Sequence, residues 1–141
     1  MEAVSFSKFK DCLDAWNKKN ELGAQCLSQQ KPGQSSDDLS KVTDELKEVL
    51  DTMSQEYTAI VKQAGFQETL SSESTDIPNE ITLLRNCLDM YDQEFMVKEC
   101  IKGVASNQGF ATQQHLSGSI ALWKSESYLD DEIQLQIKQL K

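Results

Sequence analysis

The sequence predicts an all-α fold, in which long antiparallel helices form a coiled-coil-like bundle with short helices at the C-terminal end. Two observations predict it: apolar residues recur at spacings of three and four rather than two, and only two Pro and six Gly interrupt the 141 residues. With 38% apolar residues, the chain is long enough for one modest core. We therefore expect a single domain over residues 1–141.

The first helix is predicted over residues 4–29, because its apolar residues follow one helical stripe. The stripe consists of Val4, Phe6, Phe9, Cys12, Leu13, Trp16, Cys26 and Leu27. Pro32 and Gly33 then fall among small polar residues, a composition typical of a flexible connection. We expect a flexible linker over about residues 30–38.

The second helix is predicted from residue 39 to about residue 64, with Gly65 at its C-terminal cap and Asp37 or Asp38 as the N-terminal cap. Its apolar residues occupy the a and d positions of a heptad repeat, broken only by Glu56. They are Leu39, Val42, Leu46, Val49, Met53 and Ile60. The acidic, hydroxyl-rich residues that follow predict a second flexible linker over about residues 66–77.

Three further helices are predicted in the second half of the chain. The third begins near Pro78, a residue favoured in the first turn, and runs to about Ala105. Leu116, Ile120 and Trp123 define a short fourth helix. The apolar residues of the fifth are Leu129, Ile133, Ile137 and Leu140, after a first turn rich in acidic residues, as the helix dipole favours.

Composition argues against several classes of function. The 23 acidic and 14 basic residues give a formal charge of -9, which opposes direct binding to a phosphate backbone. No apolar run approaches the roughly 20 residues of a membrane span, so we expect no membrane contact and an intracellular protein. The four cysteines form no CxxC pair, and we favour free, buried thiols over a disulfide framework.

The sequence also predicts a protein that is not an enzyme and holds no cofactor or metal ion. His115 is the only histidine, and no nucleophile or orienting group is recognisable beside it. The glycines form neither of the two common phosphate-binding loops. Carboxylates are plentiful, but they fall on polar faces where they ordinarily serve solvation.

The apolar material exceeds what three long helices can easily bury, so we expect another chain to complete at least one face. Each aromatic residue taken singly is better explained by the chain's own core, and it is the aromatic residues taken together that favour a partner. The expected partner interface consists of Leu39, Val42, Leu46, Val49, Met53, Tyr91, Trp123 and Tyr128.

Three local patterns carry a resemblance to a known family. The first is an aromatic residue, a Trp seven positions later, then Asn and Gly, as in Phe9, Trp16, Asn20 and Gly23. The second is Leu-x-Met-Tyr-x-x-Glu-x-x-x-Lys, formed by Leu88, Met90, Tyr91, Glu94 and Lys98. The third is a Trp followed by Tyr, an aliphatic residue and an acid, as in Trp123, Tyr128, Leu129 and Asp130. With these patterns in this order, the chain resembles the cyclin-dependent kinase 2-interacting protein family over about three quarters of its length.

The resemblance implies a non-catalytic adaptor or scaffold subunit of an AAA ATPase complex of the spermatogenesis-associated protein 5 class. Such a subunit pairs with a second small helical subunit, and the pair docks on the ATPase; a cell-cycle kinase is a further implied partner. The assembly acts in protein remodelling at replication forks, in genome maintenance and in maturation of the large ribosomal subunit. This implies a nuclear and cytoplasmic location.

A second hypothesis rests on periodicity alone. Heptad helices of this kind also serve structural coiled-coil subunits of unrelated assemblies, such as kinetochore, Mediator or tethering complexes. The aromatic patterns distinguish the two hypotheses, because a generic coiled-coil subunit has no need of Trp123 and Tyr128 at their spacing.

Overall fold

A computed structural model describes residues 5–70 and 76–140 of the chain, with side chains described for residues 5–63 and 80–140. The helices are α1 (Ser7–Gln29), α2 (Asp38–Leu70), α3 (Asp76–Asn107), α4 (Gln113–Ser125) and α5 (Asp131–Lys138). The described ranges contain no strand, so the all-α prediction is confirmed.

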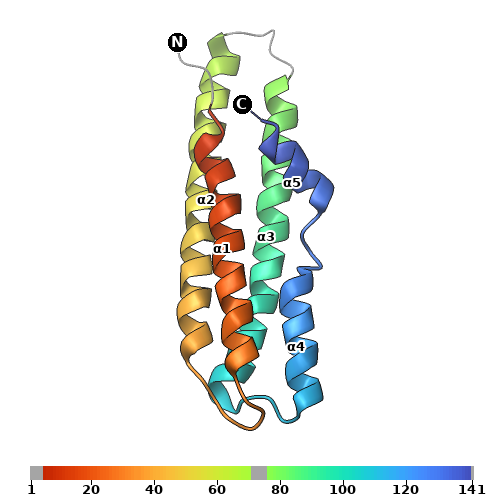
Figure 1. The fold of residues 1–141 in the computed structure, drawn as a ribbon. Helices are drawn as coiled ribbons and strands as arrows, with labels where there is room; N and C mark the ends of the chain where they lie inside the picture. Colours follow the sequence, from red (N-terminus) through yellow and green to blue (C-terminus); the bar gives the residue numbers. More distant parts are fainter. Residues whose placement is uncertain (1–4, 71–75, 141) are drawn as a thin grey trace.

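The helices form an antiparallel bundle with four columns (Figure 1). α1, α2 and α3 are three columns, and α4 and α5 lie end to end as the fourth. α2 packs against α1 and α3, while α4 and α5 each pack against α1 and α3 on the opposite side. The two short helices therefore close the bundle that three long helices would leave open.

The core follows the spacing that the sequence predicts, as α3 illustrates best. Its buried stripe alternates steps of three and four residues, the pattern of a helix that faces a bundle interior. The stripe consists of Leu84, Cys87, Tyr91, Glu94, Lys98, Ile101 and Ala105. Two charged side chains thus occupy core positions, and they form the centre of the site described below.

The boundaries between α2 and α3 differ from the predicted ones. α2 continues past Gly65 to Leu70, and α3 begins at Asp76, so Pro78 is its third residue rather than its first. A glycine inside a helix costs only about 1 kcal/mol relative to alanine, which does not stop a helix of this length. Residues 71–75 of the expected linker lie outside the described residues, as does Val4 of the first helix.

Residues 30–37 connect α1 to α2 and run beside the turn between α3 and α4. The N–H of Gly33 donates to the carbonyl of Phe110 at 2.6 Å, and the N–H of Ser36 donates to that of Ala105 at 2.8 Å. Gly109 has a φ of +75°, and a Cβ there would lie 2.3 Å from the carbonyl oxygen of Gln34. Only glycine allows the two segments to approach so closely.

Side-chain caps define where the fourth column starts and restarts. The hydroxyl of Thr112 accepts a hydrogen bond from the N–H of His115 at 3.0 Å, which caps the start of α4. The carboxylate of Asp130 accepts from the N–H groups of Glu132 and Ile133 at the start of α5. Residues 126–130 therefore form a defined break in the column.

None of the helices described is long and apolar enough to span a membrane.

Candidate functional site

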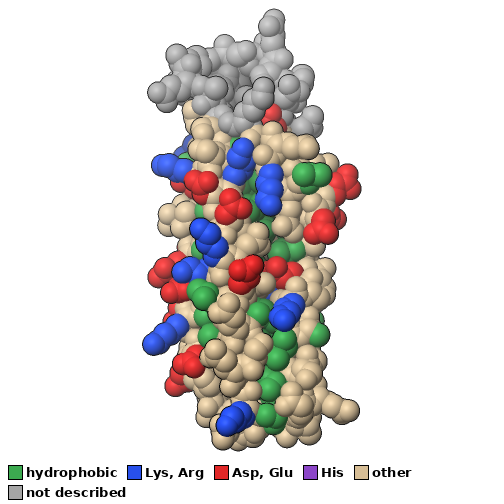
Figure 2. Space-filling model, in the orientation of Figure 1, with side chains coloured by type: hydrophobic (Ala, Val, Ile, Leu, Met, Phe, Trp, Pro, Cys, Tyr) green, Lys and Arg blue, Asp and Glu red, His purple; other side chains and the backbone are tan. Residues whose placement is uncertain are grey.

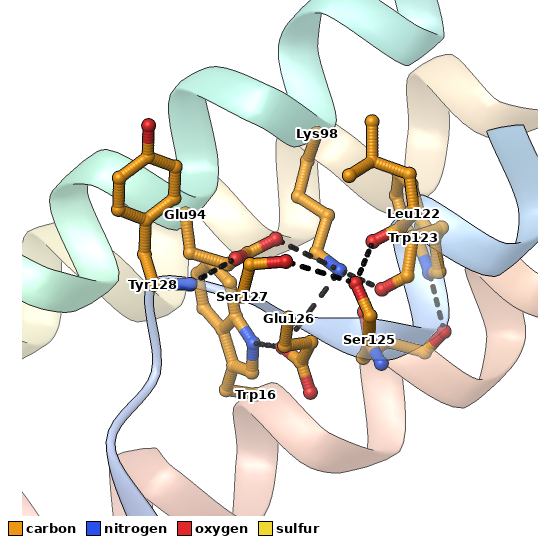
Figure 3. A network of polar contacts seen from close by, with 10 residues as sticks. Trp16, Glu94, Lys98, Leu122, Trp123, Ser125, Glu126, Ser127 and Tyr128 are labelled. Carbon is orange, nitrogen blue, oxygen red and sulfur yellow. Dashed lines mark hydrogen bonds and ion pairs between the residues drawn. The ribbon is translucent and has the colours of Figure 1, made fainter.

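A buried polar cluster lies beside the break between α4 and α5, and Lys98 of α3 is at its centre (Figure 3). The Lys98 side chain is fully buried, and its Nζ lies 3.4 Å from Oε2 of Glu94 and 3.7 Å from Oε2 of Glu126. The same ammonium donates a hydrogen bond to the backbone carbonyl of Trp123 and lies 4.4 Å from the centre of its ring. Lys98 thus joins α3 to the end of α4.

Glu126 ends α4 in an unusual conformation. Its φ of 44° and ψ of 57° are left-handed, which is uncommon for a residue other than glycine. This geometry turns its side chain into the bundle, where Oε2 accepts a hydrogen bond from the indole N–H of Trp16 at 2.7 Å. Glu94 holds the next part of the break, because its Oε1 accepts from the backbone N–H of Tyr128 at 3.3 Å.

Burial opposes the charges of this cluster, and their pairing offsets that opposition. Desolvation raises the pKa of Glu126, while the hydrogen bond from Trp16 and the charge of Lys98 act against the rise. Desolvation likewise lowers the pKa of Lys98, and the two carboxylates act against the fall. A buried ion pair gives little net stability but fixes the position of its members. The cluster therefore fixes how residues 126–130 lie against α1 and α3.

Aromatic packing surrounds the charges. Trp16 and Tyr91 meet edge to face, with ring centres 5.0 Å apart and planes at 81°. The indole N–H of Trp123 donates to the carbonyl of Asn20 at 2.8 Å. Gly23 lies directly under the Trp123 ring, because a Cβ at this position would be 2.1 Å from Cζ2. The glycine therefore lets α1 and α4 come together.

The cluster brings together members of all three sequence patterns that carry the family resemblance. Trp16, Asn20 and Gly23 belong to the first pattern and contact members of the other two. The second and third patterns also meet where the N–H of Asp130 donates to Sδ of Met90 at 3.2 Å. Residues more than a hundred positions apart are thus one structural unit.

Most of the expected interface residues lie inside this chain's own core. The residues with 0–6% exposure are Leu39, Val42, Leu46, Met53, Tyr91 and Trp123. Val49 is half-buried, and Tyr128 is 51% exposed. The reason is that α2 packs against α1 and α3, and that α4 and α5 pack against α1 and α3 on the other side, so this chain covers these side chains itself. The partner interface itself stays a prediction, and of its residues Tyr128 is the one most available to another chain.

Sequence reasoning missed Glu126 and underrated two of its neighbours. Glu94 and Lys98 carry a detectable signal, since a Glu and a Lys four residues apart both fall on the buried stripe of α3. Nothing in the local sequence distinguishes Glu126 from other acidic residues. Its role depends on a backbone conformation that only the packed break imposes.

The cysteines are all free, as the sequence favoured, but only two of the four are buried. Cys12 and Cys87 lie in the core, Cys26 is half-buried and Cys100 is exposed. Burial raises the pKa of the Cys87 thiol to about 12 and, together with Glu56 and Asp11, that of Cys12 to about 11. These two thiols are therefore protonated and unreactive at neutral pH.

Among the side chains described, those of residues 5–63 and 80–140, no group of three His, Cys, Asp or Glu has the geometry to hold a metal ion. Comparison with family models, curated proteins and solved structures finds no match.

Proposed function

We propose that the chain is a non-catalytic adaptor or scaffold subunit of an AAA ATPase complex of the spermatogenesis-associated protein 5 class. In this proposal the protein acts in the nucleus and cytoplasm, in protein remodelling at replication forks and in maturation of the large ribosomal subunit. A second small helical subunit pairs with it, and the ATPase supplies the chemistry.

One observation supports the proposal above the rest: the three patterns behind the family resemblance assemble into one buried cluster. Here Trp16 contacts Tyr91 and Glu126, and Trp123 contacts Asn20 and Lys98. If this chain has the same fold as the family it resembles, the residues of the three shared patterns should contact one another in this way.

The geometry favours docking through the outside of a preformed bundle. The core is closed by its own fourth column, so a partner need not complete it. Around the α4–α5 break, the backbone N–H of Tyr128 donates to the buried carboxylate of Glu94, while the ring of Tyr128 is exposed. The buried cluster thereby fixes the position of an exposed aromatic side chain, a residue type enriched at protein interfaces.

Affinity purification from native cells tests this proposal. The tagged protein is isolated gently with and without ATP, and its stoichiometric partners are identified by mass spectrometry. We expect one AAA ATPase and one small helical companion. Recovery of a different helical complex that lacks any ATPase would overturn the proposal in favour of the structural coiled-coil subunit.

A pair of variants sharpens the test at single-residue level. Tyr128→Ala removes the exposed ring but keeps the backbone N–H that bonds Glu94, so the fold should be retained. Leu135→Ala is the matched control, because Leu135 is similarly exposed at 57% and is not an expected interface residue. We expect Tyr128→Ala to reduce partner recovery several-fold and Leu135→Ala to leave it unchanged. Equal recovery in both variants would remove Tyr128 from the interface.

A further inference from the structure

A groove of about 480 Å³ runs along the outside of the bundle between α1 and α2. Its apolar lining consists of Cys12 and Ala15 from α1 and Val49 from α2. Thr52 of α2 also lines the groove, and its hydroxyl donates to the carbonyl of Glu48. All residues that line the groove belong to α1 and α2, in a part of the chain where side chains are fully described.

The hollow continues along the same pair of helices. A second part of about 330 Å³ shares Glu45 with the first and reaches Leu22 and Cys26 on α1 and Val42 on α2. Leu22 is 43% exposed, which is unusual for a leucine in a well-packed helix pair. Together the two parts follow α1 from residue 12 to residue 26, about 21 Å at 1.5 Å per residue.

Some of the lining positions have the spacing of a helical seam, namely residues 12, 15, 19, 22 and 26 on α1 and residues 42, 45, 49 and 52 on α2. Other lining residues lie beside or beyond them, namely Lys8, Asp11, Gln25 and Gln29 on α1 and Asp38, Lys41, Glu48 and Glu56 on α2. Steps of three and four alternate along both seams, as they do along coiled-coil faces. Two antiparallel helices that present such faces side by side form the kind of groove into which a third helix packs.

The rim of the groove is acidic. Its first part is bordered by four carboxylates, Asp11, Glu45, Glu48 and Glu56, and by two lysines, Lys8 and Lys19. Lys19 and Glu45 pair with each other at 3.1 Å, whereas the other three carboxylates form no ion pair within the described residues. Figure 2, in the orientation of Figure 1, shows acidic and basic side chains spread over the face that carries α1, with hydrophobic side chains between them.

We propose that the α1–α2 groove docks a basic amphipathic helix of a partner protein. This inference rests on the proposed adaptor function and names the kind of partner segment involved. The apolar face of the incoming helix lies on Ala15 and Val49, and its Lys or Arg side chains pair with Glu48, Glu56 and Asp11. The length of the groove fits four turns of helix.

The first experiment uses a fluorescent 18-residue helical peptide as the probe, with Leu on one face and Lys on the others. Anisotropy measures its binding to the full chain, and mass spectrometry follows maleimide labelling of Cys26, which lines the groove. Cys100 is the internal reference, since it lines a separate hollow between α3 and α4. We expect saturating peptide to slow labelling of Cys26 at least fivefold and to leave Cys100 unchanged.

Charge reversal separates the groove from general attraction to an acidic protein. Glu48→Lys combined with Glu56→Lys reverses the rim, and Asp92→Lys combined with Glu99→Lys makes the same charge change on the exposed face of α3. We expect the rim variant to bind the peptide at least tenfold more weakly and the control variant to bind within about threefold of the unmodified protein. Equal weakening in both variants would overturn the proposal.

Other occupants give distinct results. Slower labelling of Cys26 at higher protein concentration without peptide would identify a second copy of this chain and overturn the proposal. Protection of Cys100 alone would move the docking site to the α3–α4 hollow. If the rim variant still recovers the ATPase complex from cells, the groove assignment fails while the adaptor function stands. If the peptide docks in the groove but purifications contain no ATPase, the adaptor function fails while the groove assignment stands.

Discussion

The two flanks of α1 each contain a small residue, but the two residues have opposite effects on packing. Toward α4, Gly23 is covered by the ring of Trp123, so closely that no Cβ would fit. Toward α2, Ala15 borders an open groove of about 480 Å³. The first small residue permits close packing, and the second leaves a hollow.

The difference lies in what stands opposite each residue. Trp123 is held over Gly23 by its hydrogen bond to Asn20 and by the ammonium of Lys98, so its ring has one position. Opposite Ala15 stand Val49 and Thr52, which are themselves small. A tight contact at a small residue therefore needs a large side chain opposite it that is held in place by its own interactions. Where both helices present short side chains, a groove is left between them.

Removing the charge at the centre of the tight flank should have the largest effect. Lys98→Met keeps the side-chain length but leaves the carboxylates of Glu94 and Glu126 buried without their cation. Breaking a buried ion pair in this way costs about 3–5 kcal/mol. Urea unfolding followed by circular dichroism measures the loss. Lys124→Met, at an exposed position of α4, is the matched control and should change stability by less than about 0.5 kcal/mol.

Adding one methyl group to the tight flank should have the next largest effect. Gly23→Ala places a Cβ 2.1 Å from Cζ2 of Trp123, so the ring or the helix must shift. Overpacking of this kind costs about 1–3 kcal/mol. The control is Gly118→Ala on α4, where no atom lies within 4 Å and the better helix propensity of alanine should add up to about 1 kcal/mol. Stabilisation by both substitutions would contradict the tight contact.

Sequence reasoning predicts the fold from the same features that make the flanks differ. The stripes of α1, α2 and α3 follow from spacing, and so do the short helices around Leu116, Trp123 and Ile137. What spacing cannot give is that α4 and α5 stack end to end, because the break depends on the left-handed Glu126. Nor does spacing give which helices pack against one another, so a seam residue of α2 such as Leu46 looks like an interface although this chain's own core covers it.

The pH dependence of stability should report the burial of Glu126. Its pKa is raised above the ordinary 4.5 in the folded state, so the folded protein retains a proton that the unfolded chain releases. The resulting stability is complete below about pH 4.5 and is lost as the pH rises through the folded pKa. Glu126→Gln keeps an acceptor for the indole of Trp16 and removes the titration.

Urea unfolding of both proteins at several pH values from 4 to 7 isolates this effect. The stability of the native protein relative to Glu126→Gln should decline as the pH rises. A constant difference, or one that grows with pH, would mean that pairing with Lys98 outweighs desolvation and that the cluster favours the charged carboxylate.

The smallest expected effect belongs to the open flank. Ala15→Leu adds three carbon atoms on the side of α1 where the groove has room, so the fold should accept it with a change of less than about 0.5 kcal/mol. The same instrument and conditions used for Gly23→Ala give a direct comparison of the two flanks. A loss as large as that of Gly23→Ala would mean that the groove closes in solution, and the difference between the flanks would disappear. A negligible loss accompanied by weaker peptide docking would show that the hollow is kept open for binding rather than for folding.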